Sequence, residues 1–178
     1  MPVKEICRYA GCPSPGEQEL AQIRECLEML EGKLSCRVCW TEVSLPWDAL
    51  PEDSVSMKTY LAGCSGAVVF GATAGLEPDR LIARYGRISP VKSLFFQAAG
   101  AAAIENLCDI FCGELAQAYA PARLKPRFSP GYGDLPLTVQ REFFTLLDCP
   151  RKIGLTLNDS MLMSPSKSVT ALIGIAEK

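Results

Sequence analysis

The fold depends most on one long stretch, residues 89–119, which reads SPVKSLFFQAAGAAAIENLCDIFCGELAQAY. Ser89 is a residue type favoured at a helix N-cap, and Pro90 is favoured at the first helical position. A long helix is therefore predicted over about residues 90–119. Its apolar face comprises Leu94, Ala98, Ala101, Ala102, Leu107, Cys108, Phe111 and Leu115. Small residues in its middle would let another segment approach closely. We expect this helix to be the buried spine of the fold.

Shorter elements are expected on both sides of this helix. The spacing of apolar residues predicts helices at about 17–31, 55–61, 79–87 and 137–147, and strands at about 34–44, 67–70, 153–157 and 169–175. Gly71 to Gly75 should turn the chain, and Cys149-Pro150 should end the last helix. No internal repeat or interdomain linker is visible in residues 1–178. We predict a single α+β domain with an antiparallel or mixed twisted β-sheet and helices packed against one side.

Composition excludes several classes of partner. The chain has 178 residues, of which 48% are hydrophobic, enough for one sizeable core. Its formal net charge of -2, with mixed signs, provides no basic field for nucleic acid. Met1 to Glu5 carry charge where a signal peptide needs an apolar run, and the most apolar window, Leu94 to Ile104, is too short to span a bilayer. We expect a cytoplasmic protein that binds neither nucleic acid nor membrane.

The chain contains nine cysteines and no histidine. A Ser/His or Cys/His dyad and an imidazole metal ligand are therefore excluded within these residues. An odd number of cysteines without an export signal indicates reduced thiols. Cys108 and Cys112 lie four residues apart on one face of the long helix, where a core position is favoured over a reactive thiol pair.

One cysteine spacing suggests a metal or redox site. Cys36 and Cys39 form a C-x-x-C motif, and Cys7 and Cys12 are candidates for further ligands of zinc or an iron–sulfur cluster. The alternation of apolar and polar residues around Cys36 predicts a strand, in which the two thiols would project from opposite faces. A Cys-based metal or thiol protein therefore stays open as the weaker alternative.

A loop beginning at Arg127, with the sequence RFSPGYGDLPL, has the chemistry of a small-molecule site. The guanidinium of Arg127 is a planar donor fork suited to a carboxylate. Pro130 fixes its own φ, while Gly131 and Gly133 permit positive φ or close approach of a ligand to the main chain. Tyr132 adds a phenol. Composition alone favours a solvated loop with turn residues, so the segments that follow decide the interpretation.

The C-terminal third resembles the activation domain of vitamin B12-dependent methionine synthase. In that family an R-x-x-x-G-Y motif, a P-L helix start, a strand and a segment like S-x-M-x-P-x-K-S-V form the S-adenosylmethionine site. Arg127, Gly131 and Tyr132 match the first motif, and residues 160–169 resemble the last segment. The N-terminal residues 1–60 diverge from the family.

The resemblance implies the residues that bind S-adenosylmethionine. They are Glu105, Arg127, Pro130, Gly131, Tyr132 and Gly133. Arg127 would pair with the carboxylate of the ligand and Glu105 with its ammonium, while Tyr132 would pack on or hydrogen-bond to the adenosine half. No side chain would act as a covalent catalyst.

The resemblance also implies a function. The chain would be a methyltransferase-associated activation (reactivation) subunit that binds S-adenosylmethionine for reductive methylation of cob(II)alamin. The cobalamin would be carried by the partner, a cobalamin-dependent methionine synthase or related corrinoid protein on which the chain acts in trans, and flavodoxin or ferredoxin would donate the electron. A non-catalytic binding or regulatory protein for a corrinoid methyltransferase is the main alternative.

Overall fold

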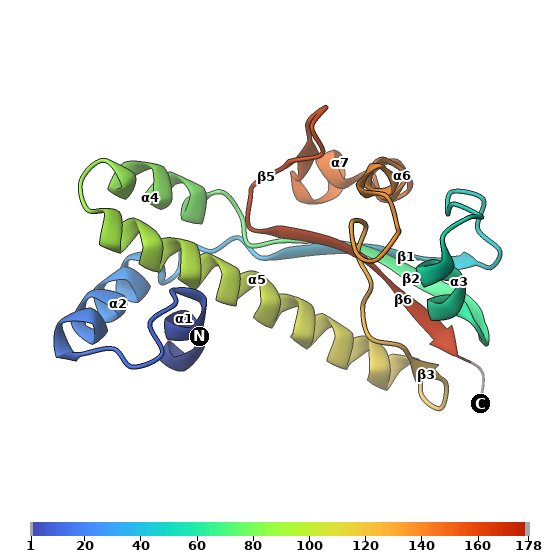
Figure 1. Cartoon of the computed structure of the whole chain (residues 1–178), viewed down its shortest axis with the longest axis horizontal. Coiled ribbons are helices and arrows are strands. Elements are labelled where there is room, and N and C mark those ends of the chain that lie inside the picture. Colours follow the sequence, from blue (N-terminus) through green and yellow to red (C-terminus); the bar gives the residue numbers. More distant parts are fainter. Residues whose placement is uncertain (1, 177–178) are drawn as a thin grey trace.

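A computed structural model describes residues 2–176 of the chain (Figure 1). The helices, including one short 3-10 helix, are α1 (Val3–Tyr9), α2 (Glu17–Leu30), α3 (Val55–Leu61), α4 (Glu77–Gly86), α5 (Pro90–Ala118), η1 (Leu137–Val139), α6 (Gln140–Leu147) and α7 (Cys149–Ile153). The strands are β1 (Arg37–Ser44), β2 (Cys64–Thr73), β3 (Arg123–Leu124), β4 (Thr156–Leu157), β5 (Met163–Ser164) and β6 (Ser168–Ala176). The α+β class and the long central helix are as predicted.

The main sheet has the strand order β1-β2-β6-β3, and every neighbouring pair in it is antiparallel. At the middle of the sheet, Phe70 of β2 lies opposite Trp40 of β1 and Ala171 of β6. β3 pairs only with the last two residues of β6, so most of the outer edge of β6 has no strand beside it. β4 and β5 form a separate two-stranded sheet.

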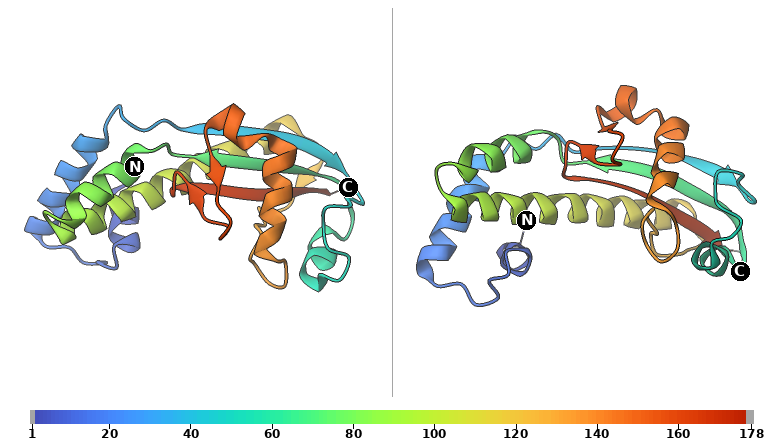
Figure 2. Two further views of the ribbon diagram at one scale, coloured as in Figure 1. Left: turned by 90° about the horizontal axis from the view of Figure 1, so that it is seen from above. Right: turned by 45° about the horizontal axis from the view of Figure 1, so that its top comes forward.

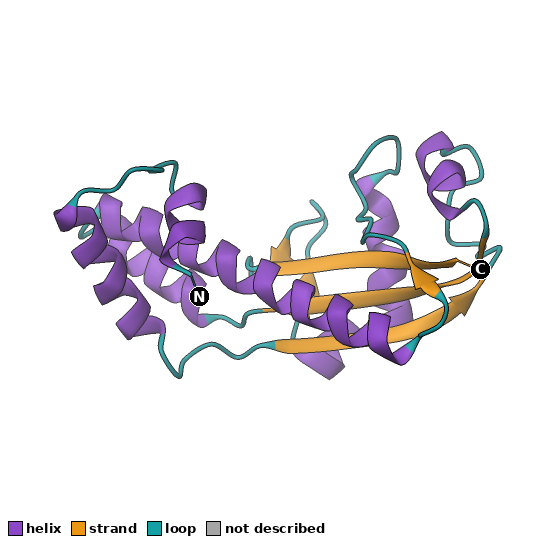
Figure 3. Ribbon diagram, turned by 90° about the horizontal axis from the view of Figure 1, so that it is seen from below, coloured by secondary structure: helices purple, strands orange, loops and turns teal. Residues whose placement is uncertain are grey.

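Helices cover both faces of the main sheet. α5 lies across one face (Figure 3), where Phe111 packs in the same cluster as Phe70 and Ile173. α6 and α7 cover the other face, where Phe143 packs with Leu172. Side chains alternate along a strand, so adjacent residues of β6 serve opposite cores, and a strand buried on both faces is apolar almost throughout. The expectation that helices lie against one side only is therefore wrong.

The N-terminal half of α5 extends beyond the sheet and packs against α1, α2 and α4 (Figure 2). The helix begins as predicted: the hydroxyl of Ser89 accepts a hydrogen bond from the backbone N–H of Lys92 at 3.4 Å, and Pro90 occupies the first turn. The side chains buried at this end include Ile6, Ile23, Leu30 and Phe96. The same helix thus contributes to the helical cluster and to the sheet, as expected of the buried spine.

Four local expectations need correction. Helix α1 was not predicted, and β2 continues through the expected turn at Gly71 because it pairs with strands on both sides. Cys149 and Pro150 begin α7 instead of ending a helix; the break lies at Asp148, whose φ is 52°, and proline is tolerated in a first helical turn. The strand expected at 153–157 shortens to β4 because Ile153 ends α7.

Helix α5 also corrects the expectation about hydropathy. One 18-residue window of this helix reaches a mean hydropathy of 1.2, so it is long and apolar enough to cross a membrane by length and composition alone. In this structure 56% of that window is buried by protein, and a core helix of a soluble protein meets the same criterion. Most of its apolar residues pack against the sheet or the N-terminal helices, whereas Val91, Leu94 and Ile110 are exposed, Leu94 against expectation.

Candidate functional site

The loop after β3 runs along the outer edge of β6 before it turns away. The backbone N–H of Lys125 donates to the carbonyl of Gly174 at 2.9 Å, and Phe128 and Leu172 exchange two backbone hydrogen bonds of 2.9 and 2.8 Å. Arg127 lies between these anchor points, so its backbone is fixed by the sheet. At Ser129 the chain leaves β6, and the strand edge beyond this point is open.

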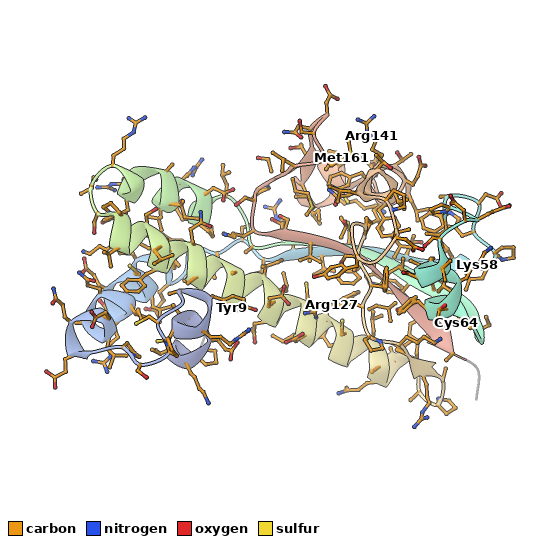
Figure 4. The ribbon with its side chains drawn as sticks, in the orientation of Figure 1. Tyr9, Lys58, Cys64, Arg127, Arg141 and Met161 are labelled. Atoms are coloured by element: carbon orange, nitrogen blue, oxygen red, sulfur yellow. The ribbon has the colours of Figure 1, made fainter. Side chains whose placement is uncertain are left out.

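Arg127 points toward α5 and pairs there with two carboxylates (Figure 4). Its Nη1 donates to Oδ1 of Asp109 at 2.7 Å, and its Nη2 pairs with Oε2 of Glu105. The two acids lie one helical turn apart, so both reach the same guanidinium. Burial alone lowers the pKa of Arg127, but the hydrogen bond to Asp109 and the charge of Glu105 outweigh it and raise the pKa. Without a ligand, Arg127 and Glu105, the cation and the acid predicted to bind it, therefore pair with each other.

Glu105, Arg127, Pro130 and Tyr132 line one cavity of about 370 Å³. This volume falls within the range of small-molecule sites, roughly 300–1,000 Å³. Four of the six predicted site residues therefore share a cavity. Tyr132 is 67% exposed at its rim and meets the ring of Phe128 edge-on at 6.3 Å between centroids, so its phenol is free to contact a bound molecule.

Gly131 and Gly133, the other two predicted site residues, shape the loop and do not line this cavity. Both have positive φ, 91° and 58°. The N–H of Gly131 donates to the carbonyl of Leu135 at 2.9 Å, which closes the turn. A Cβ on Gly133 would clash with Oγ of Ser56, so the close approach of this loop to α3 favours glycine there.

Asp134 attaches the same loop to the N-terminus of α3. Its carboxylate accepts hydrogen bonds from the hydroxyl of Ser54 at 2.6 Å and from the backbone N–H groups of Val55 and Ser56 at 2.8 and 3.1 Å. The hydrogen bond from Ser54, followed by those from the two backbone groups, lowers the pKa of Asp134 to about 2. Asp134 lies just before η1 and α6 in the sequence, but it caps a helix about eighty residues earlier in the chain.

The C-terminal segments also contribute to the cavity. Met163, Ser168 and Val169 come from the segment 160–169, which the resemblance places in the ligand site, whereas sequence reasoning missed Gln140 and Thr170. Gln140 is buried and its Nε2 donates to the carbonyl of Met161 at 3.2 Å. The hydroxyl of Ser168 also has partners, Oγ1 of Thr73 and the carbonyl of Pro165, both at 2.8 Å.

Thr170 differs from these neighbours. Its side chain is 2% exposed, and within residues 2–176 its Oγ1 is the one buried side-chain polar atom without a hydrogen-bond partner. Buried polar groups are almost always paired, so an unpaired hydroxyl that lines a cavity indicates a place for a ligand. The sequence alone does not single out Thr170, because Ser168 is a second polar residue on the same face of β6.

The cysteine thiols do not lie where a shared metal site would need them. Cys36 is exposed, whereas Cys39 is buried with its Sγ 3.8 Å from Sγ of Cys149 at the start of α7. The hydrogen bond between the two thiols lowers the pKa of Cys39 and raises that of Cys149. Cys108 is a core residue of α5, and burial raises its pKa to about 12. Over residues 2–176, no three His, Cys, Asp or Glu side chains gather as metal ligands would.

A larger cavity lies elsewhere, with a volume of about 690 Å³ between α3 and the loop that contains Trp47. Its charged residues are Asp48, Glu52 and Lys58 at an otherwise mostly apolar groove. We assign the candidate site to the smaller cavity because it combines a guanidinium, a carboxylate and a buried unpaired hydroxyl. Size alone is the weaker criterion, since specificity in ligand sites comes from a few convergent polar groups.

Part of the chain that forms this cavity matches a known protein family by sequence. Residues 118–178 match the activation domain of vitamin B12 dependent methionine synthase. The match covers the last third of the chain, including β3, the loop from Arg127 and β6. No curated protein matches the sequence.

The fold is similar to the one in the crystal structure of the MetH reactivation domain bound to AdoHcy. The TM-score is 0.55 at 16% sequence identity, and the match covers 89% of this chain. The chain spans 65% of the length of that solved chain. The likeness therefore extends over residues well before the activation-domain match, and it concerns the fold.

Proposed function

We propose that this chain is an activation subunit for a cobalamin-dependent methionine synthase and that it binds S-adenosylmethionine in the cavity beside Arg127. The observation that carries the proposal is the convergence of Glu105, Arg127 and the unpaired hydroxyl of Thr170 on one cavity. This cavity is built largely from the segment that matches the activation domain. On this proposal, residues 1–178 act as a single activation-like domain whose first 60 residues diverge from the family.

The charges of the cavity suit an amino-acid zwitterion. Arg127 would receive the ligand carboxylate on its guanidinium fork, and Glu105 would receive the ligand ammonium. The ion pair between these two residues would then be replaced by two pairs with the ligand, while Asp109, whose side chain is 71% exposed, can be hydrated. Two opposite charges 4 Å apart attract by about 4 kcal/mol at an effective dielectric of 20, and by about 1 kcal/mol in water. The 26% exposure of the Arg127 side chain places this site between those limits.

The residues of this chain would bind and orient the ligand without becoming covalently modified. Tyr132, at the rim, would cover the adenosine half. The methyl group would pass to the partner's cobalamin after its one-electron reduction: a cobalt–carbon bond would form, the sulfur–methyl bond would break, and the electron pair would stay on sulfur to give S-adenosylhomocysteine.

The partner would be a cobalamin-dependent methionine synthase or a related corrinoid protein on which this chain acts in trans in the cytoplasm. Flavodoxin or ferredoxin would supply the electron. The rim position of Tyr132, 67% exposed, supports such an arrangement because the ligand can meet a second protein at the cavity mouth.

Isothermal titration with S-adenosylmethionine tests the proposal. We expect saturable one-site binding to the purified chain. We also expect the chain and ligand to restore turnover of an oxidised methionine synthase that lacks its own activation module, in the presence of a reducing system. No heat up to millimolar ligand would contradict the proposal, and retained binding to a corrinoid methyltransferase in that case would favour the regulatory alternative.

A further inference from the structure

The unpaired hydroxyl of Thr170 is part of a larger polar feature at the open edge of β6. Backbone groups of alternate residues in an antiparallel strand point to the same edge. Leu172 uses its N–H and C=O to bond Phe128 on the outer side, and the carbonyl of Gly174 accepts from Lys125 on that side. By this alternation the N–H and C=O of Thr170 also point outward, to the edge that the chain leaves at Ser129.

Thr170 lines the cavity, and three of its polar groups therefore have no partner among the described residues. The side chain supplies a hydroxyl without a partner among the described residues, and the main chain supplies a donor and an acceptor at the unpaired part of the strand edge. Ser168, two residues earlier on the same strand, is different because its hydroxyl is already bonded twice. Among the described residues of β6, Thr170 is the one whose buried side-chain hydroxyl has no partner beside outward-facing main-chain groups.

We infer that Thr170 forms the subsite for the uncharged nucleoside half of the ligand. This inference rests on the proposed function, in which Arg127 and Glu105 hold the charged amino-acid half. A nucleoside offers neutral donors and acceptors, and an adenine edge presents an acceptor beside an amino donor, which matches a main-chain N–H beside a C=O. The hydroxyl of Thr170 supplies a further hydrogen bond, and burial strengthens all three because water is excluded.

Thr170 is then a specificity-determining residue with an unusual signature in stability. An unpaired buried hydroxyl destabilises the free protein, so its replacement by an apolar group of similar shape should be neutral or stabilising. The same replacement removes a ligand contact. Thr170→Val should therefore leave the melting temperature of the free protein unchanged or raise it, while it weakens ligand binding.

The test measures both properties with S-adenosylhomocysteine as the probe. We expect Thr170→Val to raise the dissociation constant by about 5–10-fold, the effect of one lost hydrogen bond. Thr170→Ser keeps the hydroxyl and should stay within about twofold of the parent protein. Ser168→Ala, which removes a satisfied hydroxyl, should lower the melting temperature and thus provides the contrasting stability control.

A second probe tests the main-chain groups. S-inosylhomocysteine reverses the donor and acceptor on the purine edge, so we expect it to bind at least about 10-fold more weakly than S-adenosylhomocysteine. Equal affinity for the two nucleosides, unchanged affinity in Thr170→Val, or a clear loss of melting temperature in that variant would each overturn the inference. If the unsubstituted protein binds neither compound, the proposed function itself fails, which is a different result.

Discussion

Replacement of Arg127 by glutamine separates a ligand-binding role from a structural one. The change removes the charge and most of the donors but keeps a polar side chain of moderate length. It leaves Glu105 and Asp109 on α5 without their cation. Both acids can be hydrated, because the side chain of Glu105 is 40% exposed and that of Asp109 is 71% exposed.

The magnitudes differ for the two roles. Exposed ion pairs contribute about 0–1 kcal/mol each, so the free energy of unfolding should fall by about 1 kcal/mol and the melting temperature by about 2–4 °C. Hydrogen bonds to charged groups contribute about 1.5–3 kcal/mol, so the affinity for S-adenosylmethionine should fall by about 10–100-fold. The variant should thus lose much of its binding and little of its stability.

The assay combines isothermal titration with a thermal melt of the same preparation. Arg123→Gln is the matched control, because Arg123 is an exposed arginine on the neighbouring strand β3 and does not line the cavity. We expect it to retain both properties of the parent protein. A fall in melting temperature of more than about 10 °C in Arg127→Gln would make Arg127 structural, and unchanged affinity would refute its assignment to the ligand carboxylate.

Three further outcomes test the framework of the site. The pKa of Asp134 is lowered to about 2 in the folded protein from its usual 3.8, so its stabilising contribution is present above about pH 4 and is lost as the pH falls toward 2. The melting temperature of Asp134→Asn should therefore lie below that of the parent protein at pH 7 and approach it at pH 2. A difference in melting temperature that stays constant with pH would contradict this. Gly133→Ala should destabilise by about 1–3 kcal/mol in chemical denaturation, because φ is 58° and the added Cβ meets Ser56; a neutral change would show that α3 can shift away. Leu172→Ala, at a fully buried position, should cost about 2–5 kcal/mol in the same assay, whereas Leu162→Ala, at 65% exposure, should change stability by less than about 0.5 kcal/mol; equal effects would contradict the described core.

Sequence periodicity predicted the elements that depend on local signals. The N-cap at Ser89 and the apolar stripe of α5 are encoded within a few residues of one another, and the structure places the helix at Pro90–Ala118. The strand predicted at 169–175 likewise corresponds to β6, Ser168–Ala176. The extent of β2 was underestimated because Gly71 is a turn residue by propensity, whereas here it is held in the strand by β1 and β6.

Features that depend on distant parts of the chain could not be predicted. Asp134 caps α3, and Cys39 lies beside Cys149, because the folded sheet and helices bring separate segments together. The residue types of the loop at Arg127 indicated a small-molecule site, but the role of Gly133 depends on its closeness to α3, which the sequence does not show. Thr170 was overlooked because a polar residue in a strand is ordinary until its missing partner is known.

A crystal structure of this chain with S-adenosylhomocysteine tests the central claim most directly. We expect density for the amino-acid carboxylate at the guanidinium of Arg127, for its ammonium at Glu105, and for the nucleoside along the edge of β6 at Thr170. Density for the ligand in the larger groove near Trp47, or an empty Arg127 cavity at saturating ligand, would contradict the assignment of the site.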